Sequence, residues 1–324
     1  MMQRRSILQA LATIPACSLP NTHAQEKYPS QAITIVVPYA PGGNVDAMAR
    51  LVSVQMGKTL GQAVVIENRP GAAGVIGTDF VNRSKPNGYT LVCTANGSFI
   101  VAPRMVPKRP FQTTDFAAVG SIGSTPMVLE GNPKGRFKTL SELIGFAKAH
   151  PEEVTLGHPG NGTTNHIAIL RLQEVTGARF GIVAYKGSAP ALNDLLGGQI
   201  DGLVDQLPSS LPHIKAHKLI PYALTSKEGS SDLPGVKPLA DSGYPNFEVT
   251  TVTGLLAPAK TPSAIMEALN KALGSALADS DVQRRLRTLG TNPMPGSAKQ
   301  FADFLLTEDQ SAESMFRQGL LRPE

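Results

Sequence analysis

A glycine-rich bend stands directly between an apolar run and an amphipathic run near the start of the chain. Residues 33–37 are largely β-branched, and Pro38-Tyr39-Ala40-Pro41-Gly42-Gly43-Asn44-Val45-Asp46 follows them, which is the pattern of a strand that leads into a helix. The first turn of a helix leaves backbone N–H groups unpaired and carries about half a positive charge. A small anion at Gly42 to Asp46 would satisfy both, so this first bend (residues 38–46) is predicted to bind an anion.

A second bend repeats this arrangement much later in the chain. The run Gly157-His158-Pro159-Gly160-Asn161-Gly162-Thr163-Thr164-Asn165-His166 again leads from a short strand into a helix. Two helix starts that face one cleft would clamp a carboxylate. Charge-assisted hydrogen bonds contribute roughly 1.5–3 kcal/mol each, so four or five backbone donors reach about 8 kcal/mol net, a micromolar affinity without an arginine.

Each polar residue near the bends also has a purely structural interpretation. Asp46 can favour the dipole of its own helix, and Thr163 or Thr164 can act as an N-cap. His166 is interpreted as a packed residue at the helix start rather than a catalytic group. Asp205 directly follows an apolar strand, so it either lines the cleft or caps the next helix, and both interpretations stay open.

Several classes of site and partner are not predicted. His158 and His166 lie eight residues apart across a glycine bend, and neither a CxxC nor an HExxH pattern occurs, so we expect no metal site and no cofactor. No run of basic residues with interleaved aromatic residues occurs, so nucleic acid is not an expected partner despite a pI near 9.2. No stretch after residue 25 approaches 18 consecutive apolar residues, so the chain is not expected to be embedded in a membrane.

The N-terminus has the composition of a secretory signal. Arg4 and Arg5 precede the apolar stretch 7–16, and small residues near Ala24 form a cleavage site, so residues 1–24 are predicted to be a signal peptide. Its removal lowers the formal net charge from +5 to +3. The arginine pair also resembles a twin-arginine signal, which leaves the export route open. The mature chain keeps only Cys93, so no internal disulfide is expected.

Strand and helix patterns alternate along the chain, which indicates an α/β fold. The predicted elements of the first unit are the helix after the first bend, which Gly61 ends, strand 64–66, helix 75–82 and strand 89–94. Because these strands are continuously apolar, we expect parallel sheet that is covered on both faces. In 324 residues with 41% hydrophobic residues, two domains are expected.

A second unit begins near residue 126. Its predicted strands are 127–129, 154–157, 182–185, 200–204 and 220–226, and its predicted helices begin near 139, 164, 189 and 209. The stretch 230–245 is predicted to be a loop that returns toward the first unit, strand 253–257 to complete the return, and three helices to close the chain. The predicted domains are therefore 25–125 plus 250–324 for domain I and 126–249 for domain II.

With these segments in order, the chain resembles the Bug family, the periplasmic receptors of tripartite tricarboxylate transporters. The resemblance extends from about Tyr28 to the C-terminus. Its markers are Pro38-Tyr39-Ala40-Pro41-Gly42-Gly43 with Asp46, Glu67-Asn68-Arg69-Pro70-Gly71, Asn87-Gly88-Tyr89-Thr90-Leu91, Gly160-Asn161-Gly162-Thr163 with His166, Tyr185-Lys186-Gly187 through Gly198, Asp205 with Leu207-Pro208-Ser209, and Gly254-Leu255-Leu256-Ala257-Pro258.

The resemblance implies a type II periplasmic-binding-protein fold, in which two α/β domains joined by two crossover strands enclose a carboxylated solute in the cleft between them. It assigns the anion contacts to Tyr39, Ala40, Gly42 and Gly43, and makes Asp46 the position that reads the other end of the ligand. The opposing contacts and the remaining candidate ligand-binding positions at the markers are Asn161, Thr163, Thr164, Tyr185, Gly187 and Asp205.

Departures from the family pattern leave the solute open. The family often has Trp or Phe just before Gly254, where this chain has Val252 and Thr253, and a common Asn is replaced by Ala102. A dicarboxylate, a tricarboxylate, an acidic amino acid and an aromatic acid all remain candidates.

The leading hypothesis is a monomeric periplasmic receptor that closes on a small carboxylate and delivers it to membrane transporter subunits, performing no chemistry itself. A second hypothesis gives the closed receptor a signalling role toward a membrane sensor kinase. A third is an exported hydrolase that uses Ser188 or Ser209 with His213, which the absence of a Gly-x-Ser-x-Gly motif disfavours.

Overall fold

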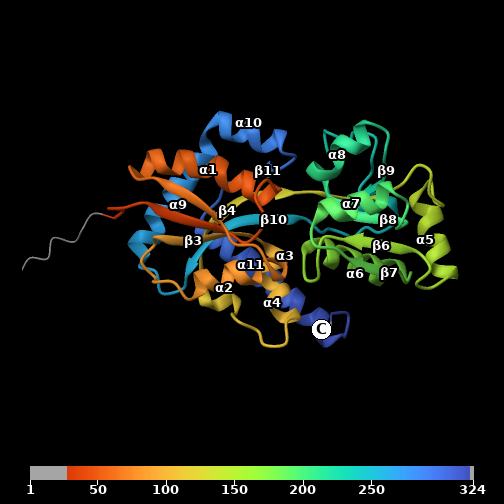
Figure 1. Cartoon of the computed structure of the whole chain (residues 1–324), viewed down its shortest axis with the longest axis horizontal. Helices are drawn as coiled ribbons and strands as arrows, with labels where there is room; N and C mark the ends of the chain where they lie inside the picture. The colour runs from red at the N-terminus through yellow and green to blue at the C-terminus, as the bar shows by residue number, and fades with distance from the viewer. Residues whose placement is uncertain (1–27, 322–324) are drawn as a thin grey trace, which may run out of the picture.

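The computed structural model describes residues 28–321, so the predicted signal peptide lies outside the described residues. Within them the strands form two sheets, one of six strands in the order β11-β4-β10-β3-β1-β2 and one of five strands in the order β7-β6-β8-β5-β9. The two sheets lie one after the other along the long axis of the molecule, and each has helices on both faces (Figure 1). In the described part of the chain, no helix combines the length and the apolar character needed to cross a bilayer.

The six-stranded sheet combines the N-terminal part of the chain with a strand that returns from the second unit. Its strands are β1 (Ile33–Val37), β2 (Val64–Asn68), β3 (Thr90–Ala95), β4 (Phe116–Thr125), β10 (Thr251–Pro258) and β11 (Asn292–Pro293). β1 pairs in parallel with β2 and β3. β10 lies between β3 and β4 and is antiparallel to both.

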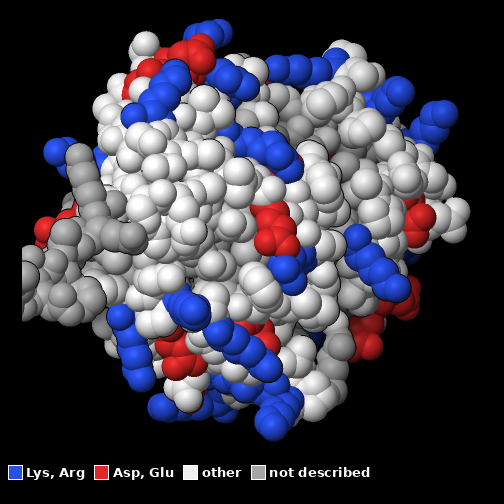
Figure 2. All heavy atoms as spheres, turned by 60° about the vertical axis from the view of Figure 1, so that its left-hand side comes forward, with Lys and Arg blue, Asp and Glu red and all other residues white. Residues whose placement is uncertain are grey.

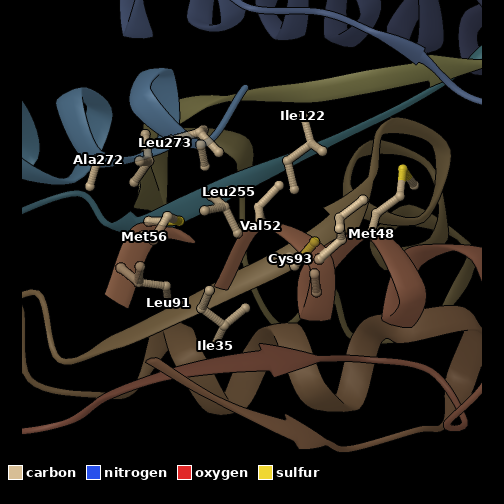
Figure 3. Close-up of a cluster of buried hydrophobic side chains, with 14 of the residues drawn as sticks. Ile35, Met48, Val52, Met56, Leu91, Cys93, Ile122, Leu255, Ala272 and Leu273 are labelled. Carbon is tan, nitrogen blue, oxygen red and sulfur yellow. The ribbon is translucent and has the colours of Figure 1, made fainter. Parts of the chain in front are cut away.

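Helices cover this sheet on two sides (Figure 1). One side carries α1 (Asn44–Leu60), α9 (Ser263–Ala278) and α10 (Ser280–Thr288), and the other carries η1 (Ala72–Gly74), α2 (Val75–Asn82), α3 (Asn96–Ile100), α4 (Ala102–Met105) and α11 (Ala298–Arg317). Figure 3 shows the core beneath α1, where Met48, Val52 and Met56 lie in one buried cluster with Leu255 and Cys93 of the sheet. These residues stand four positions apart in the sequence, a spacing that predicts one face of a helix, and in α1 that face is buried.

The five-stranded sheet holds the middle of the chain. Its strands are β5 (Met127–Gly131), β6 (Thr155–His158), β7 (Gly181–Ala184), β8 (Gly202–Gln206) and β9 (Ile220–Leu224). Its helices are α5 (Leu140–Ala149) and α6 (Thr164–Thr176) on one face and α7 (Ser188–Leu196) and α8 (Leu207–Lys215) on the other.

The prediction of parallel sheet is correct for only part of each sheet. β1 to β3 are parallel, as are β6, β7 and β8, but β5 is antiparallel to β8 and β9. The exceptions arise because the chain crosses between the sheets, passing from β4 directly into β5 and returning through β10. A strand that enters from the neighbouring sheet runs against the strands already there.

Two further expectations need correction. The stretch 230–245 does not return toward the first unit, because it packs on the second. Leu239 within it and Phe247 just after it belong to the buried cluster that contains residues of α5 and α6, and Leu239 N–H donates to Leu224 O. The 3₁₀ turn η3 (Ala240–Ser242) lies within it. The pair Thr261-Pro262 predicts an N-cap at Thr261 with proline at the first helical position, but α9 begins one residue later, with Pro262 as its N-cap. β4, α3 and α4 were not predicted.

The packing of β10 against α11 yields a stability prediction. A Cβ added to Gly254 would lie 2.3 Å from the Phe301 ring and 2.8 Å from Gly120 O. Gly254→Ala is therefore expected to lower the free energy of unfolding by about 1–3 kcal/mol. Gly274→Ala is the matched control, because this α9 glycine has open space around its Cβ position and alanine favours the helix by up to about 1 kcal/mol. Urea unfolding of both variants tests this, and equal stability would contradict it.

Candidate functional site

The first bend leaves the start of α1 open. Gly42 has φ +85°, a conformation that suits glycine, and Gly43 is the extended N-cap of the 17-residue helix α1. No side chain caps this helix. The N–H groups of its first turn, at the edge where β1 ends, are therefore not satisfied by the side-chain cap that most helices carry.

Asp46 braces this bend from within its own unit. Its Oδ2 accepts from Gly42 N–H (2.9 Å) and from Arg50 Nε (2.9 Å), and its Oδ1 accepts from Asn68 Nδ2 (2.8 Å). Burial by itself raises the pKa of Asp46, but the hydrogen bonds from Arg50, Gly42 and Asn68 together lower it. The side chain is only 2% exposed. These contacts favour a role for Asp46 in positioning the bend over one in touching a ligand.

Tyr39 is also held by its own unit. Asn68 Nδ2 donates to its backbone oxygen (3.1 Å), and its hydroxyl lies 3.2 Å from Thr94 Oγ1. Burial raises the pKa of the Tyr39 hydroxyl. A Cβ built on Gly74 of η1 would lie 3.4 Å from the Tyr39 ring, so η1 packs directly against the first bend.

Two stacked histidines support the second bend. The rings of His158 and His166 lie 4.4 Å apart and nearly parallel. Gly162 N–H donates to His166 Nδ1 (3.3 Å), and His158 Nδ1 lies 2.9 Å from Gly160 O. Burial lowers the pKa of His158 to about 3 and that of His166 to about 4, so both rings are neutral at pH 7. The interpretation of His166 as a structural residue agrees with these contacts.

The N-cap of α6 is Thr163. Its Oγ1 accepts from His166 N–H (3.4 Å) and donates to Gly160 O (2.7 Å). Asn161 lies between Gly160 and Gly162 at the tip of the turn. The second bend therefore resembles the first in its place after a strand, but its helix start carries a side-chain cap.

Side chains connect the two units at both bends. From the first bend, Asn44 Nδ2 donates to Gln206 Oε1 at the end of β8 (3.2 Å). From the second bend, Thr164 Oγ1 donates to Asn96 Oδ1 at the start of α3 (3.0 Å). A Cβ built on Gly160 would lie 3.9 Å from Ala73 of η1. Since η1 also packs against Tyr39, both bends border the same segment of the first unit.

Asp205 lies at the end of β8 and is fully buried. Ser188 Oγ donates to its Oδ1 (2.6 Å), while its Oδ2 has no partner among the described residues. Burial raises the pKa of Asp205 to about 7. Glu130 is buried on the neighbouring strand β5, where Ser210 Oγ donates to its Oε1 (2.5 Å) and burial raises its pKa well above the usual range.

The remaining predicted site residues shape α7. Gly187, with φ +117°, is its N-cap and donates its N–H to Pro159 O (3.0 Å), which ties α7 to the second bend. The Tyr185 hydroxyl donates to Asp194 Oδ2 (2.8 Å) in the same unit.

Sequence reasoning missed four amide side chains that hold this region together: Asn44, Asn68, Asn96 and Gln206. Asn96 also accepts from Val252 N–H (3.2 Å) and therefore joins α3, α6 and β10. A general signal was available, because three of the four lie at the end of a strand or directly after one, the edge where open α/β sheets bind ligands.

On the face that Figure 2 shows, most atoms belong to uncharged residues, and the basic side chains are scattered, some of them beside acidic ones. This face shows no continuous basic surface among the described residues.

Comparison with known proteins gives a coherent set of matches. The family model described as the tripartite tricarboxylate transporter family receptor matches residues 48–318. Protein BugT of Bordetella pertussis is 34% identical over 295 residues, which is 90% of each chain. The solved structure of MatC from Rhodopseudomonas palustris with bound malate is 31% identical, has a TM-score of 0.80 and covers 89% of this chain and 99% of its own. The structure of R. palustris Rpa4515 with adipate is 28% identical, has a TM-score of 0.84 and covers 92% of this chain and 100% of its own.

These matches confirm the resemblance read from the sequence markers. They also confirm the two-domain fold of periplasmic binding proteins. The hydrolase hypothesis has no support, because the matched family consists of binding receptors. The Ser188 hydroxyl, moreover, is hydrogen-bonded to a carboxylate rather than to a histidine.

The histidine pair yields a pH prediction. An unfolded histidine titrates near pH 6.5, while the folded pKa of His166 is about 4. Between these values the unfolded state binds the extra proton, so acid should lower the free energy of unfolding by about 1.4 kcal/mol for each pH unit and each such histidine. In His166→Asn the new amide oxygen can still accept from Gly162 N–H, but the histidine proton is lost. The slope of unfolding free energy against pH should therefore fall by about 1.4 kcal/mol per pH unit, the contribution of one proton. Urea unfolding from pH 7 to pH 4 measures it, and identical slopes would contradict the prediction.

Proposed function

The chain belongs to the tripartite tricarboxylate transporter receptor family, and on this premise we propose that it captures a small carboxylate between its two units and delivers it to the membrane subunits of such a transporter. The ligands of the two similar structures, malate and adipate, are both carboxylates. The proposal extends this ligand class to this chain. It also follows from the family that the receptor works in the periplasm.

One observation carries the proposed site: the start of α1 has no side-chain cap and lies beside the contact between the two units. Its backbone N–H groups and its dipole both favour an anion. A carboxylate there would accept from several N–H groups at once. Because these donors are backbone N–H groups, binding would not require a charged side chain of the protein to lose its water.

We assign the anion contacts to the backbone of Tyr39, Ala40, Gly42 and Gly43, with Gly42 contributing a close approach of its backbone, because its N–H already donates to Asp46. Asp46 is proposed as a positioning residue, because its recorded partners belong to its own unit. The opposing side of the clamp is proposed to comprise Asn161, Thr163, Thr164, Tyr185, Gly187 and Asp205.

The domain boundaries follow the sheets. We propose 25–125 with 250–324 as domain I and 126–249 as domain II, because the six-stranded sheet draws on the former segments and the five-stranded sheet on the latter. Export through a signal peptide cleaved near Ala24 and a monomeric state complete the proposal. Closure on the ligand would change the outer surface that the membrane subunits meet.

The open helix start can be blocked directly. Gly43 has φ −74°, and a Cβ on it would meet only Ala40 O at 3.8 Å, so Gly43→Val is expected to fold normally. Its side chain would occupy the place of the anion and abolish the thermal stabilisation that a bound carboxylate gives. Gly145→Val on the exposed side of α5 is the control and should keep that stabilisation. A thermal shift with a panel of carboxylates is the measurement, and an unchanged shift in Gly43→Val would refute the site.

The role of Asp46 can be separated from direct recognition. Because its carboxylate holds Gly42, Arg50 and Asn68, Asp46→Ala should weaken all carboxylates together and lower the free energy of unfolding by about 1–3 kcal/mol. Asp303→Ala is the control. Asp303 also forms an ion pair with a residue four positions away, Lys299, but this pair is exposed, so the variant should change neither carboxylate binding nor the free energy of unfolding appreciably. Calorimetric titration of several carboxylates decides the matter, since a loss confined to some of them would indicate that Asp46 touches the ligand.

A further inference from the structure

Three polar atoms near the start of α1 are buried without a hydrogen-bond partner among the described residues: Thr251 Oγ1, Thr253 Oγ1 and Asn44 Oδ1. The two threonines are 1% and 0% exposed. A buried polar atom without a partner is costly, and most such atoms in proteins are paired with protein or water. A cluster of them therefore indicates a place that a polar molecule fills.

The register of the sheet places these threonines on the same face as α1. Thr253 lies opposite Ala95, and Leu255, two residues further on, lies opposite Cys93. Leu255 and Cys93 belong to the core beneath α1 (Figure 3). Since side chains alternate along a strand, Thr251 and Thr253 continue this face toward the edge of the sheet at which β3 ends and α1 begins.

Asn44 links the threonine face to the helix start. Thr251 lies directly opposite Thr125 of β4, and Thr125 Oγ1 accepts from Asn44 Nδ2 (3.1 Å). Asn44 is the first residue of α1. Asn44 and, through Thr125, Thr251 therefore connect to the start of α1, whose backbone N–H groups are proposed to hold a carboxylate, and Thr253 follows on the same face of the strand.

The chemistry of the three atoms differs from that of the helix start. A threonine hydroxyl can donate and accept, and an amide oxygen can only accept. A second carboxylate would face the lone pairs of Asn44 Oδ1, whereas a neutral hydroxyl can donate to that oxygen and also accept from a threonine. An ammonium group could also donate to these oxygens, but it gains no charge neutralisation from Asp46, whose carboxylate is already held by Arg50, Asn68 and Gly42.

We propose that Thr251, Thr253 and Asn44 form a second subsite that binds a hydroxyl group of the ligand, so that the preferred solute is a short hydroxy-carboxylate. This inference rests on the proposed function, because the subsite lies beside the proposed carboxylate site. It makes the two threonines specificity-determining residues.

Three four-carbon compounds test the subsite, because L-malate, succinate and L-aspartate differ only in carrying a hydroxyl group, a hydrogen or an ammonium group. Calorimetric titration of the wild-type protein should show L-malate binding about tenfold more tightly than succinate and more tightly than L-aspartate. Thr253→Val and Thr251→Val should each bring the ratio of malate to succinate affinity close to one while succinate binding is kept. Thr253→Ser should restore the ratio.

The control is Thr261→Val, at the other end of β10, where the hydroxyl donates to Pro258 O (2.7 Å). It should lower the melting temperature and leave the ratio unchanged. Thr253→Val removes no recorded hydrogen bond and should not lower the melting temperature. Thermal unfolding without ligand therefore separates a folding defect from a lost subsite.

The outcomes distinguish this inference from the proposed function. A wild-type protein that binds succinate or L-aspartate at least as tightly as L-malate overturns the subsite and leaves the receptor function standing. A malate preference that survives in both valine variants also overturns the subsite. Binding of none of the three compounds overturns the subsite and counts against the proposed function as well.

Discussion

The open start of α1 is the constraint around which the rest of the molecule is arranged. An α-helix begins with backbone N–H groups that need acceptors, and Gly43 brings no side chain to provide one. Donors of this kind keep a fixed direction toward a ligand when other contacts hold the bend. Asp46 and Asn68 make these contacts. Asp46 accepts from Gly42 N–H, and Asn68 donates to Tyr39 O and to Asp46.

Uncharged side chains make most of the other contacts in this region. Asn44 and Asn96 reach across to the second unit, and the stacked pair His158 and His166 is neutral because burial lowers both pKa values. Amides and neutral imidazoles can join segments without adding a charge. The helix dipoles then contribute a potential at the bends that favours an anionic guest.

The strand β10 connects the architecture to the proposed recognition. Leu255 on this strand is part of the core under α1, and Thr251 and Thr253 carry the same face to the edge of the sheet. Core packing therefore fixes where the two hydroxyl groups stand relative to the start of α1. The same strand is one of the two connections between the units, so ligand contacts on it would bear directly on closure.

Local signals in the sequence determined much of the fold. The periodicity of Met48, Val52 and Met56, the left-handed cap at Gly61 and the capping box at Ser297 all specify helices through contacts within a few residues, and the structure has each of them. The two bends were recognisable for the same reason. β4 was not, because its sequence of small residues near Gly120 carries neither a strand period nor a long apolar run.

The tertiary structure alone decided how these segments meet. It inserted β10 between β3 and β4, kept the 230–245 stretch on the second unit through Leu239 and Phe247, and brought Asn44 to Gln206. The spacing of residues in the sequence predicts contacts between residues a few positions apart. These contacts instead join residues that are far apart in the chain, or they depend on the register of paired strands. The chain itself therefore specified two anion-binding bends, and only the packing of two sheets decided which polar side chains stand beside them.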